Sequence, residues 1–143
     1  MILDSSSEQE TREIARGFAK SLVGGDIILL NGDLGMGKSV FARSVIRSLC
    51  DNENLEVPSP TFTLVQTYDT SIGQVWHFDL YRLSSPEEIY EIGWEEAISS
   101  GGILLVEWSE RLGDLMPTSY MDVKFSPIID NPDKRKIEVL KHV

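Results

Sequence analysis

The eight residues from Gly32 to Ser39 carry the clearest chemistry in this sequence, because they match the G-x-x-x-x-G-K-[ST] pattern at every fixed position. Glycines allow the backbone to curl so that successive N–H groups point at the oxygens of a bound phosphate. Lys38 is expected to reach the β- and γ-phosphates of a nucleoside triphosphate, and the hydroxyl of Ser39 is expected to bind Mg²⁺. The pattern therefore predicts a phosphate-binding loop, with a plain glycine-rich turn as the structural alternative.

The segments on either side of this loop fit the same interpretation. Residues 26–31 form a short apolar run that predicts a buried strand, and residues 40–49 carry apolar side chains at helical spacing. A strand, a glycine-rich turn and a helix in this order are the context in which the pattern marks a phosphate site. The positive end of the helix dipole adds to the attraction for phosphate.

Two acidic residues near the ends of predicted strands are candidates to act with the loop. Glu107 follows the fully apolar run at 103–106, which predicts a central parallel strand that ends in an acid able to hold Mg²⁺ or its waters. Asp79 lies near the end of the strand predicted at 74–80, where its carboxylate would orient water or bind a water of the Mg²⁺ shell. An exposed acid at a strand end and a loop-capping aspartate are the respective structural alternatives.

Other candidate side chains have less specific patterns. His77 alternates with aromatic neighbours, which favours a structural histidine. Thr61 follows Pro60 in a loop that prolines stiffen, at a position after the loop's helix where a hydroxyl could sense the γ-phosphate. Arg43 and Arg82 are the candidates for an arginine that contacts the phosphates, and a helix surface is the simpler location for Arg43.

The remaining elements follow from periodicity and turn signals. Ser7 begins a capping-box pattern, and the apolar spacing after it predicts a helix that runs to the glycines at 24–25. Further helices are expected from Ser85 onward and over 94–98. Further strands are expected where β-branched and aromatic residues cluster or alternate: residues 61–68, 74–80, 120–125 and 136–140. The expected fold is an α/β P-loop NTPase with a mixed, mostly parallel central sheet, flanking antiparallel strands and helices on both faces.

Length and composition restrict the class of protein. The 143 residues predict one domain, residues 1–143, with a core of its own. The single Cys50 excludes an internal disulfide and fits a reducing compartment. The sequence contains no apolar run of membrane-spanning length and no basic segment at its start, so a cytoplasmic location without membrane contact is expected. The net charge of −10 argues against a surface that clamps nucleic-acid phosphates by itself.

Four segments together resemble one family. They are the phosphate loop at 32–39 and the runs 59–65, 77–83 and 106–108. Their order and spacing are similar to those of TsaE (also called YjeE), the bacterial ATPase of tRNA threonylcarbamoyladenosine biosynthesis. The resemblance covers nearly the whole chain, and its specific part is the run from His77 to Leu83 combined with Glu107 and Trp108.

The resemblance implies ATP and Mg²⁺ as the ligands. It implies catalytic roles for Lys38, Asp79, Glu107 and Thr61, and places Ser39 and Glu107 at the metal. The ATP-binding positions that it implies are Thr11, Leu34, Gly35, Met36, Gly37, Lys38, Ser39 and Arg135. Met36 stands where the family usually has alanine, a mild departure that concerns only the affinity for the nucleotide.

The resemblance also implies partners, namely homologues of TsaD and TsaB, with tRNA reached only through that complex. ATP hydrolysis would be weak in the isolated chain, stimulated by the partners, and used to support repeated cycles of modification of the adenosine next to the anticodon. A small-molecule kinase is the main alternative, but its phosphate lid should be basic, and the insertion at 84–100 is acidic. A GTPase would need a guanine-reading Asn-Lys-x-Asp segment, which the sequence lacks. A further alternative is a binding module that is gated by the nucleotide and whose hydrolysis is incidental.

Overall fold

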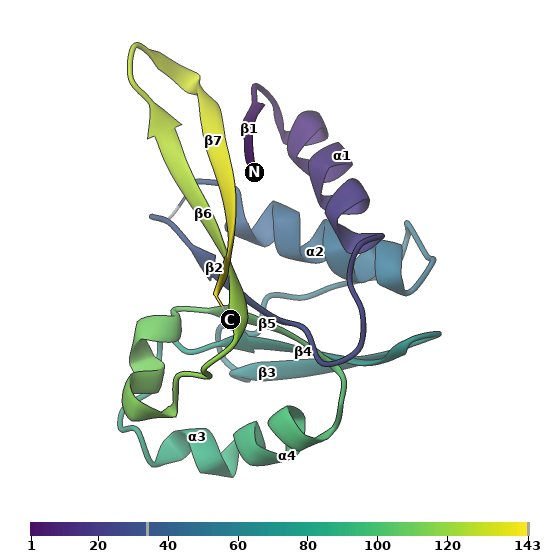
Figure 1. Ribbon diagram of the computed structural model, residues 1–143, viewed down its shortest axis with the longest axis vertical. Coiled ribbons are helices and arrows are strands. Elements are labelled where there is room, and N and C mark those ends of the chain that lie inside the picture. The colour runs from purple at the N-terminus through teal and green to yellow at the C-terminus, as the bar shows by residue number, and fades with distance from the viewer. Residues whose placement is uncertain (34, 143) are drawn as a thin grey trace.

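The computed structural model describes residues 1–33 and 35–142 and is organised around a seven-stranded sheet of order β1-β7-β6-β2-β5-β4-β3 (Figure 1). The strands are β1 (Ile2–Ser5), β2 (Ile27–Asn31), β3 (Val65–Thr70), β4 (Gly73–Asp79), β5 (Ile103–Glu107), β6 (Tyr120–Ile128) and β7 (Asn131–His142). The central strands β6, β2, β5 and β4 run parallel to one another. Antiparallel pairs flank them on both sides, β7 and β1 at one edge and β3 at the other. The predicted mixed sheet is confirmed.

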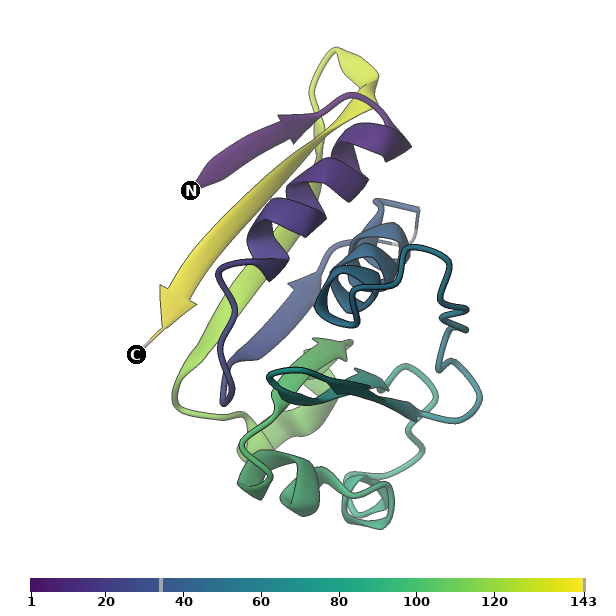
Figure 2. The same cartoon turned by 90° about the vertical axis from the view of Figure 1, so that its right-hand side faces the viewer.

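Helices cover both faces of this sheet (Figures 1 and 2). They are α1 (Glu8–Ala19), α2 (Lys38–Leu49), α3 (Glu88–Glu91), α4 (Trp94–Ser99) and the 3₁₀ helix η1 (Ser109–Leu115). Ile28 and Leu30 of β2 pack with α1 and α2, whereas Leu29 between them packs with α3, α4 and η1. This alternation explains why the central strands are apolar on both faces. Across the part of the chain that the structure describes, no helix combines the length and apolarity that a bilayer crossing requires.

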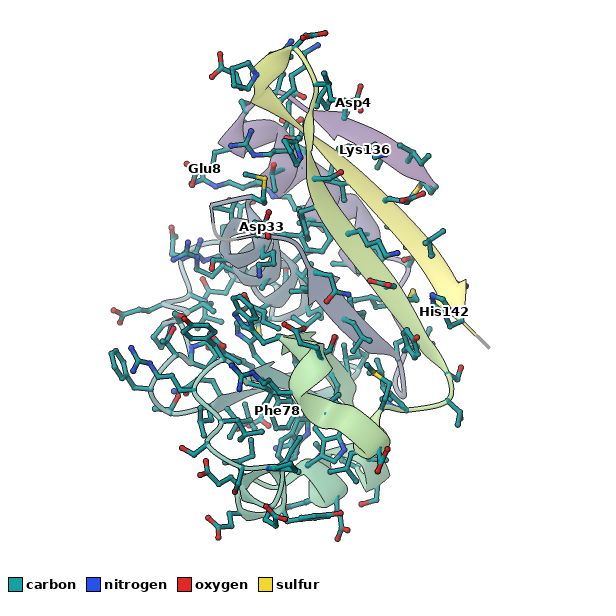
Figure 3. All side chains as sticks on the ribbon, turned by 90° about the vertical axis from the view of Figure 1, so that its left-hand side faces the viewer. Asp4, Glu8, Asp33, Phe78, Lys136 and His142 are labelled. Atoms are coloured by element: carbon teal, nitrogen blue, oxygen red, sulfur yellow. The ribbon has the colours of Figure 1, made fainter. Side chains whose placement is uncertain are left out.

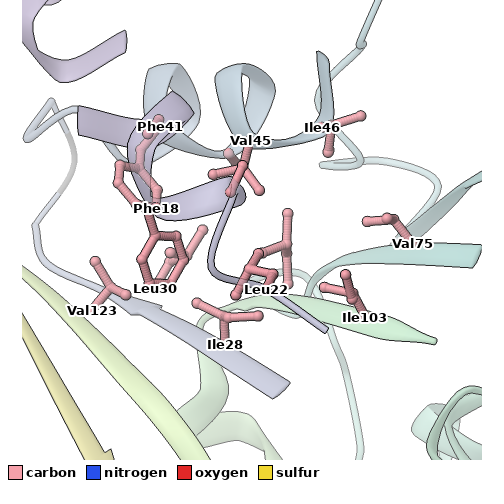
Figure 4. Packing of buried hydrophobic residues seen from close by; sticks show 14 of the residues in the cluster. Phe18, Leu22, Ile28, Leu30, Phe41, Val45, Ile46, Val75, Ile103 and Val123 are labelled. Carbon is pink, nitrogen blue, oxygen red and sulfur yellow. The ribbon is translucent and has the colours of Figure 1, made fainter. Parts of the chain in front are cut away.

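Aromatic packing fixes the helix that follows the glycine-rich loop. Phe41 of α2 lies between Phe18 of α1 and Phe125 of β6, with ring centroids 5.5 Å and 5.3 Å away. Figure 4 shows Phe18 and Phe41 facing the sheet beside Leu30 and Val123. Because these rings are buried, α2 is held rigidly against the sheet, and the loop at its start is held at the carboxyl end of β2.

The first helix is shorter than predicted. It ends at Ala19 because Ser21 and Leu22 donate backbone hydrogen bonds to carbonyls three residues earlier, at 3.0 Å and 3.2 Å, which forms tight turns in place of further helix. The predicted N-cap is confirmed, since the side chain of Ser7 accepts a hydrogen bond from the backbone N–H of Glu10 at 3.1 Å.

Several other predicted boundaries were wrong. The strands predicted at 120–125 and 136–140 are longer, since β6 continues to Ile128 and β7 begins at Asn131. Residues 61–64 do not belong to β3, because the N–H of Leu64 bonds to the carbonyl of Pro60 at 2.7 Å and Leu64 has a φ of 68°, which forms a turn. The helix predicted from Ser85 begins at Glu88, because residues 85–87 form a turn in which Ser85 accepts from Glu88 at 3.2 Å. Strand β1 and helix η1 were not predicted.

Candidate functional site

The glycine-rich loop (residues 32–39) connects β2 to α2. Gly37 precedes α2 with a φ of 96° and offers no side-chain cap, so backbone N–H groups at the start of this 12-residue helix stay free for a ligand. A Cβ atom on Gly32 would lie 2.6 Å from the carbonyl oxygen of Phe125, so the loop could not pass β6 with a larger residue there. The glycines are therefore required by the backbone path, and the resulting loop presents a helix N-terminus.

The predicted catalytic residues meet in one cleft beside this loop. The cleft has a volume of about 310 Å³. Its lining includes all the residues predicted to be catalytic or to bind the metal, namely Lys38, Ser39, Thr61, Asp79 and Glu107, together with the predicted ATP-binding positions Gly35 and Gly37. They come from the loop, the turn before β3 and the ends of two strands, so the fold brings together positions that are far apart in the chain.

Strand register explains why the two carboxylates are neighbours. Asp79 and Glu107 are paired positions at the carboxyl ends of the parallel strands β4 and β5. Both residues are buried. Burial raises the pKa of Asp79 above its ordinary value, the backbone N–H of Tyr81 at 3.1 Å opposes this rise, and the negative charge of Glu107 adds to it. The site therefore holds two acids close together, and one of them ionises less readily than usual.

His77 contacts one of these acids. Its Nε2 lies 2.8 Å from Oε2 of Glu107, and the side chains are 3% and 7% exposed. The carboxylate oxygen is the acceptor, so Nε2 carries the hydrogen and the contact fixes the orientation of Glu107. The sequence pattern favoured a structural role for His77 and did not reveal this contact. The alternation of side chains along a strand could have indicated it, because residues 77 and 79 point to the same face of β4, so His77 is expected on the side of the sheet where Asp79 lies.

Thr61 lies against the other acid. Its hydroxyl donates to Oδ2 of Asp79 at 3.4 Å and shares a 2.7 Å hydrogen bond with the hydroxyl of Ser59. The two arginines considered as phosphate contacts lie elsewhere: the guanidinium of Arg82 stacks on Phe62, 4.5 Å from the ring centroid, and Arg43 lines a different cleft. Among the described residues, Lys38 is the cation that lines this cleft.

Lys38 is held by an aromatic ring. Its Nζ lies 4.6 Å from the ring centroid of Trp108, and the Trp108 ring is in turn 4.7 Å from that of Tyr81. Within residues 1–33 and 35–142, no carboxylate forms an ion pair with Lys38, although the side chain is buried. Because a cation–π contact contributes little free energy, an incoming anion can replace the ring as the partner of the Lys38 ammonium.

A second cleft, of about 260 Å³, adjoins the first and shares Gly35, Gly37 and Val40 with it. Thr11 and Arg135 line it together with Met36, so these predicted nucleotide-binding positions lie beside the loop. They meet because β1, which precedes α1, pairs with β7 in a register that sets Ser5 opposite Arg135. Figure 3 labels Glu8, which also lines this cleft, in the upper half of the molecule, above Asp33 of the loop. The remaining predicted position, Leu34, lies outside the described residues.

The donor set fits Mg²⁺ bound together with phosphate. Across the described residues, no group of three or more His, Cys, Asp or Glu side chains could hold a metal ion alone. Mg²⁺ commonly uses one or two carboxylates plus substrate phosphates in place of an all-protein cage. A hydroxyl from Ser39 and carboxylates from Glu107 and Asp79, all lining one cleft, supply that kind of partial site.

Replacing Asp79 by asparagine is expected to raise the free energy of unfolding at neutral pH. The folded state raises the pKa of this carboxyl, so its contribution to stability is present at low pH and is lost as the pH rises through the raised value. The advantage of the variant should therefore shrink as the pH falls toward the ordinary pKa of 3.8. Urea denaturation of both proteins across pH measures this, and a variant less stable than wild type at neutral pH would contradict it.

Comparison with known proteins gives concordant matches. The family model described as "Threonylcarbamoyl adenosine biosynthesis protein TsaE" matches residues 5–137. The tRNA threonylcarbamoyladenosine biosynthesis protein TsaE of Rickettsia bellii is 50% identical over 130 residues, which span 91% of this chain and 88% of the relative. The protein of the same name from Haemophilus influenzae is 36% identical over 114 residues, or 80% of this chain and 69% of the relative.

A solved structure agrees with these sequence matches. The crystal structure of YdiB from Bacillus subtilis superposes with a TM-score of 0.79 at 25% identity, and the match covers 100% of this chain and 85% of that one. The resemblance inferred from the four sequence segments is thereby confirmed, and the chain belongs to the TsaE family.

Proposed function

We propose that this protein is a Mg²⁺-dependent P-loop protein that binds ATP, hydrolyses it weakly and is required for threonylcarbamoyladenosine modification of tRNA. The observation that carries the proposal is the cleft in which Lys38 and Ser39 of the glycine-rich loop face Asp79 and Glu107. The names of the relatives support the tRNA pathway. The loop, the carboxylate pair and the adjoining Thr11–Arg135 cleft support a nucleoside triphosphate as the ligand.

The positions and contacts of the main residues in and beside the cleft support a proposed role for each of them. Backbone N–H groups of the loop bind phosphate oxygens, and Lys38 leaves the Trp108 ring to neutralise the β- and γ-phosphates. Ser39 and Glu107 would hold Mg²⁺, which would supply charge neutralisation at the phosphates. His77 keeps Glu107 in one orientation. Asp79, whose raised pKa suits it to accept a proton, orients the attacking water.

The proposal includes homologues of TsaD and TsaB as partners, with tRNA reached through them. Weak intrinsic hydrolysis is consistent with the location of the arginines, because neither Arg43 nor Arg82 lines the cleft. A second positive charge at the γ-phosphate typically accelerates phosphoryl transfer by about 10³ or more. The kinase alternative is less well supported, since no described residue between 84 and 100 lines either cleft.

Adding the TsaD–TsaB pair is expected to raise ATP hydrolysis, and replacing Thr61 by alanine should remove most of this stimulation. Thr61 links the loop at residues 58–64 to Asp79 through its hydroxyl, so a partner that binds this loop can change the position of the acid. Steady-state ATPase assays with and without partners measure the effect. Thr63→Ala is the matched control, because Thr63 accepts a hydrogen bond from Gln66 at the surface and does not contact Asp79.

Two results would count against this scheme. Equal stimulation of wild type and Thr61→Ala would remove Thr61 from the mechanism. A complete lack of stimulation of the wild type would leave the proposed partners without their main effect on this site.

A further inference from the structure

A third cleft lies on the outer side of α1 and α2, and its cations do not belong to the site described above. We call it the arginine cleft; it is lined by Glu8, Arg12, Val40, Arg43, Ser44 and Arg47. Arg43 and Arg47 are one helical turn apart on α2, and Arg12 faces them from α1, which packs against α2. Three arginines therefore converge in a chain whose net charge is −10.

Most of the donors in this cleft are free. Glu8, the acid in the cleft, already pairs with Arg12 at 2.8 Å. Arg47 uses its Nε to donate to the carbonyl of Leu55 at 2.9 Å, which holds the side chain in place and leaves its terminal nitrogens unpaired. Arg43 is half-buried, and among the described residues it has neither an ion pair nor a hydrogen bond. Guanidinium groups that are partly desolvated and unpaired favour an external anion.

The hydroxyl-bearing residue Ser44 also lines this cleft. Ser44 is 6% exposed and forms no side-chain hydrogen bond among the described residues, and its oxygen is not one of the fully enclosed unpartnered atoms, so it can be reached from the arginine cleft. A hydroxyl at the wall of a cleft can donate a hydrogen bond to an oxyanion that the neighbouring arginines attract. The floor of the cleft thus presents an unused hydroxyl between the unpaired arginines of α2.

We infer that the arginine cleft is a second anion site, which takes a phosphate group. Arginine forks bind tetrahedral oxyanions through paired hydrogen bonds, and the Ser44 hydroxyl can donate one more. The cleft, of about 220 Å³, is large enough to admit a phosphate group. A neighbouring cleft shares Arg12, Ser44 and Arg47 and adds Arg16, so a ligand with several phosphates could extend into it. Asp51 and Glu53 also line this extension and limit how many phosphates it accepts. The phosphate belongs either to a small free anion or to an RNA backbone.

The test is an NMR titration of the intact protein with inorganic phosphate at constant ionic strength, followed at the side-chain Nε–H groups of Arg43 and Arg47. These signals report the arginine cleft, while the amide of Gly37 separately reports phosphate in the glycine-rich loop. Saturable shifts at both arginines are expected, with no equivalent shifts on addition of sodium acetate. Arg43→Gln should weaken the binding seen at Arg47 roughly tenfold, because one charge-assisted pair of hydrogen bonds is lost.

Controls keep the result interpretable. Arg111→Gln makes the same charge change on the exposed surface of η1 and should leave binding unchanged. Ser44→Ala, which keeps the charge, should also weaken binding. Non-saturating shifts, equal shifts with acetate, or unchanged affinity in both cleft variants would overturn the inference. A second titration with a short single-stranded RNA identifies the source: tighter binding than inorganic phosphate indicates backbone phosphates, and equal or weaker binding indicates a small anion.

Discussion

Replacing Lys38 by alanine is expected to abolish nearly all ATP hydrolysis and to weaken the binding of ATP much more than that of adenosine. Lys38 is the cation lining the cleft among the described residues, and no carboxylate there neutralises it. Loss of a positioned charge at the transferred phosphate should cost on the order of 3 kcal/mol or more in the transition state, a rate loss of about a hundredfold or greater. Single-turnover assays measure the rate, and calorimetry measures the two affinities.

The control for this variant is Lys141→Ala, which removes the same charge from an exposed position on β7. It should leave both hydrolysis and ATP affinity close to wild type. Equal ATP affinity for Lys38→Ala and wild type would contradict the assignment of Lys38 to the phosphates.

Replacing Glu107 by alanine is expected to make ATP binding far less dependent on Mg²⁺, whereas Asp79→Ala should preserve Mg²⁺-dependent binding and depress turnover. The two acids are neighbours across β4 and β5, but their contacts differ. Glu107 is oriented by His77, as expected of a metal ligand, whereas Asp79 contacts Thr61 and the N–H of Tyr81. ATP affinities measured over a range of Mg²⁺ concentrations distinguish the roles.

Glu107→Gln separates the metal effect from a folding effect. The amide oxygen can still accept the hydrogen bond from His77, so the variant should fold while it lacks the charge that attracts the ion. Identical Mg²⁺ profiles for the Glu107 and Asp79 variants would show that the separate roles are wrong.

The parts of the fold that sequence predicted well depend on local patterns. β2, the glycine-rich loop and α2 follow from an apolar run, fixed glycine positions and helical spacing, all within 24 consecutive residues from 26 to 49. β1 has four residues and is stabilised by pairing with β7 from the other end of the chain, so no local signal marks it. Residues 61–64 have strand-like composition, but the Pro60–Leu64 hydrogen bond makes them a turn.

The sequence singled out residues that the structure brings together in the candidate cleft, but it did not reveal most of their contacts. Asp79 and Glu107 each follow a strand pattern, yet their pairing depends on the register of β4 against β5, which is a long-range property. The contacts of Lys38 with Trp108 and of His77 with Glu107 depend on the same packing. The arginine cleft could not be predicted from the net charge either. A sum over the whole chain does not show that three arginines meet between α1 and α2.

The measurement that tests the central claim most directly is the number of tRNA molecules modified by each complex when this chain is combined with TsaD and TsaB homologues, tRNA and threonylcarbamoyl-adenylate. The account predicts repeated cycles with the wild-type chain and ATP. It predicts that the complex stops after a single cycle with Asp79→Ala, which should bind ATP without turning it over. The contradicting result is an Asp79→Ala variant that sustains as many modification cycles as wild type while failing to hydrolyse ATP. ATP hydrolysis would then not be needed for tRNA modification, and the protein would be a nucleotide-gated binding module instead.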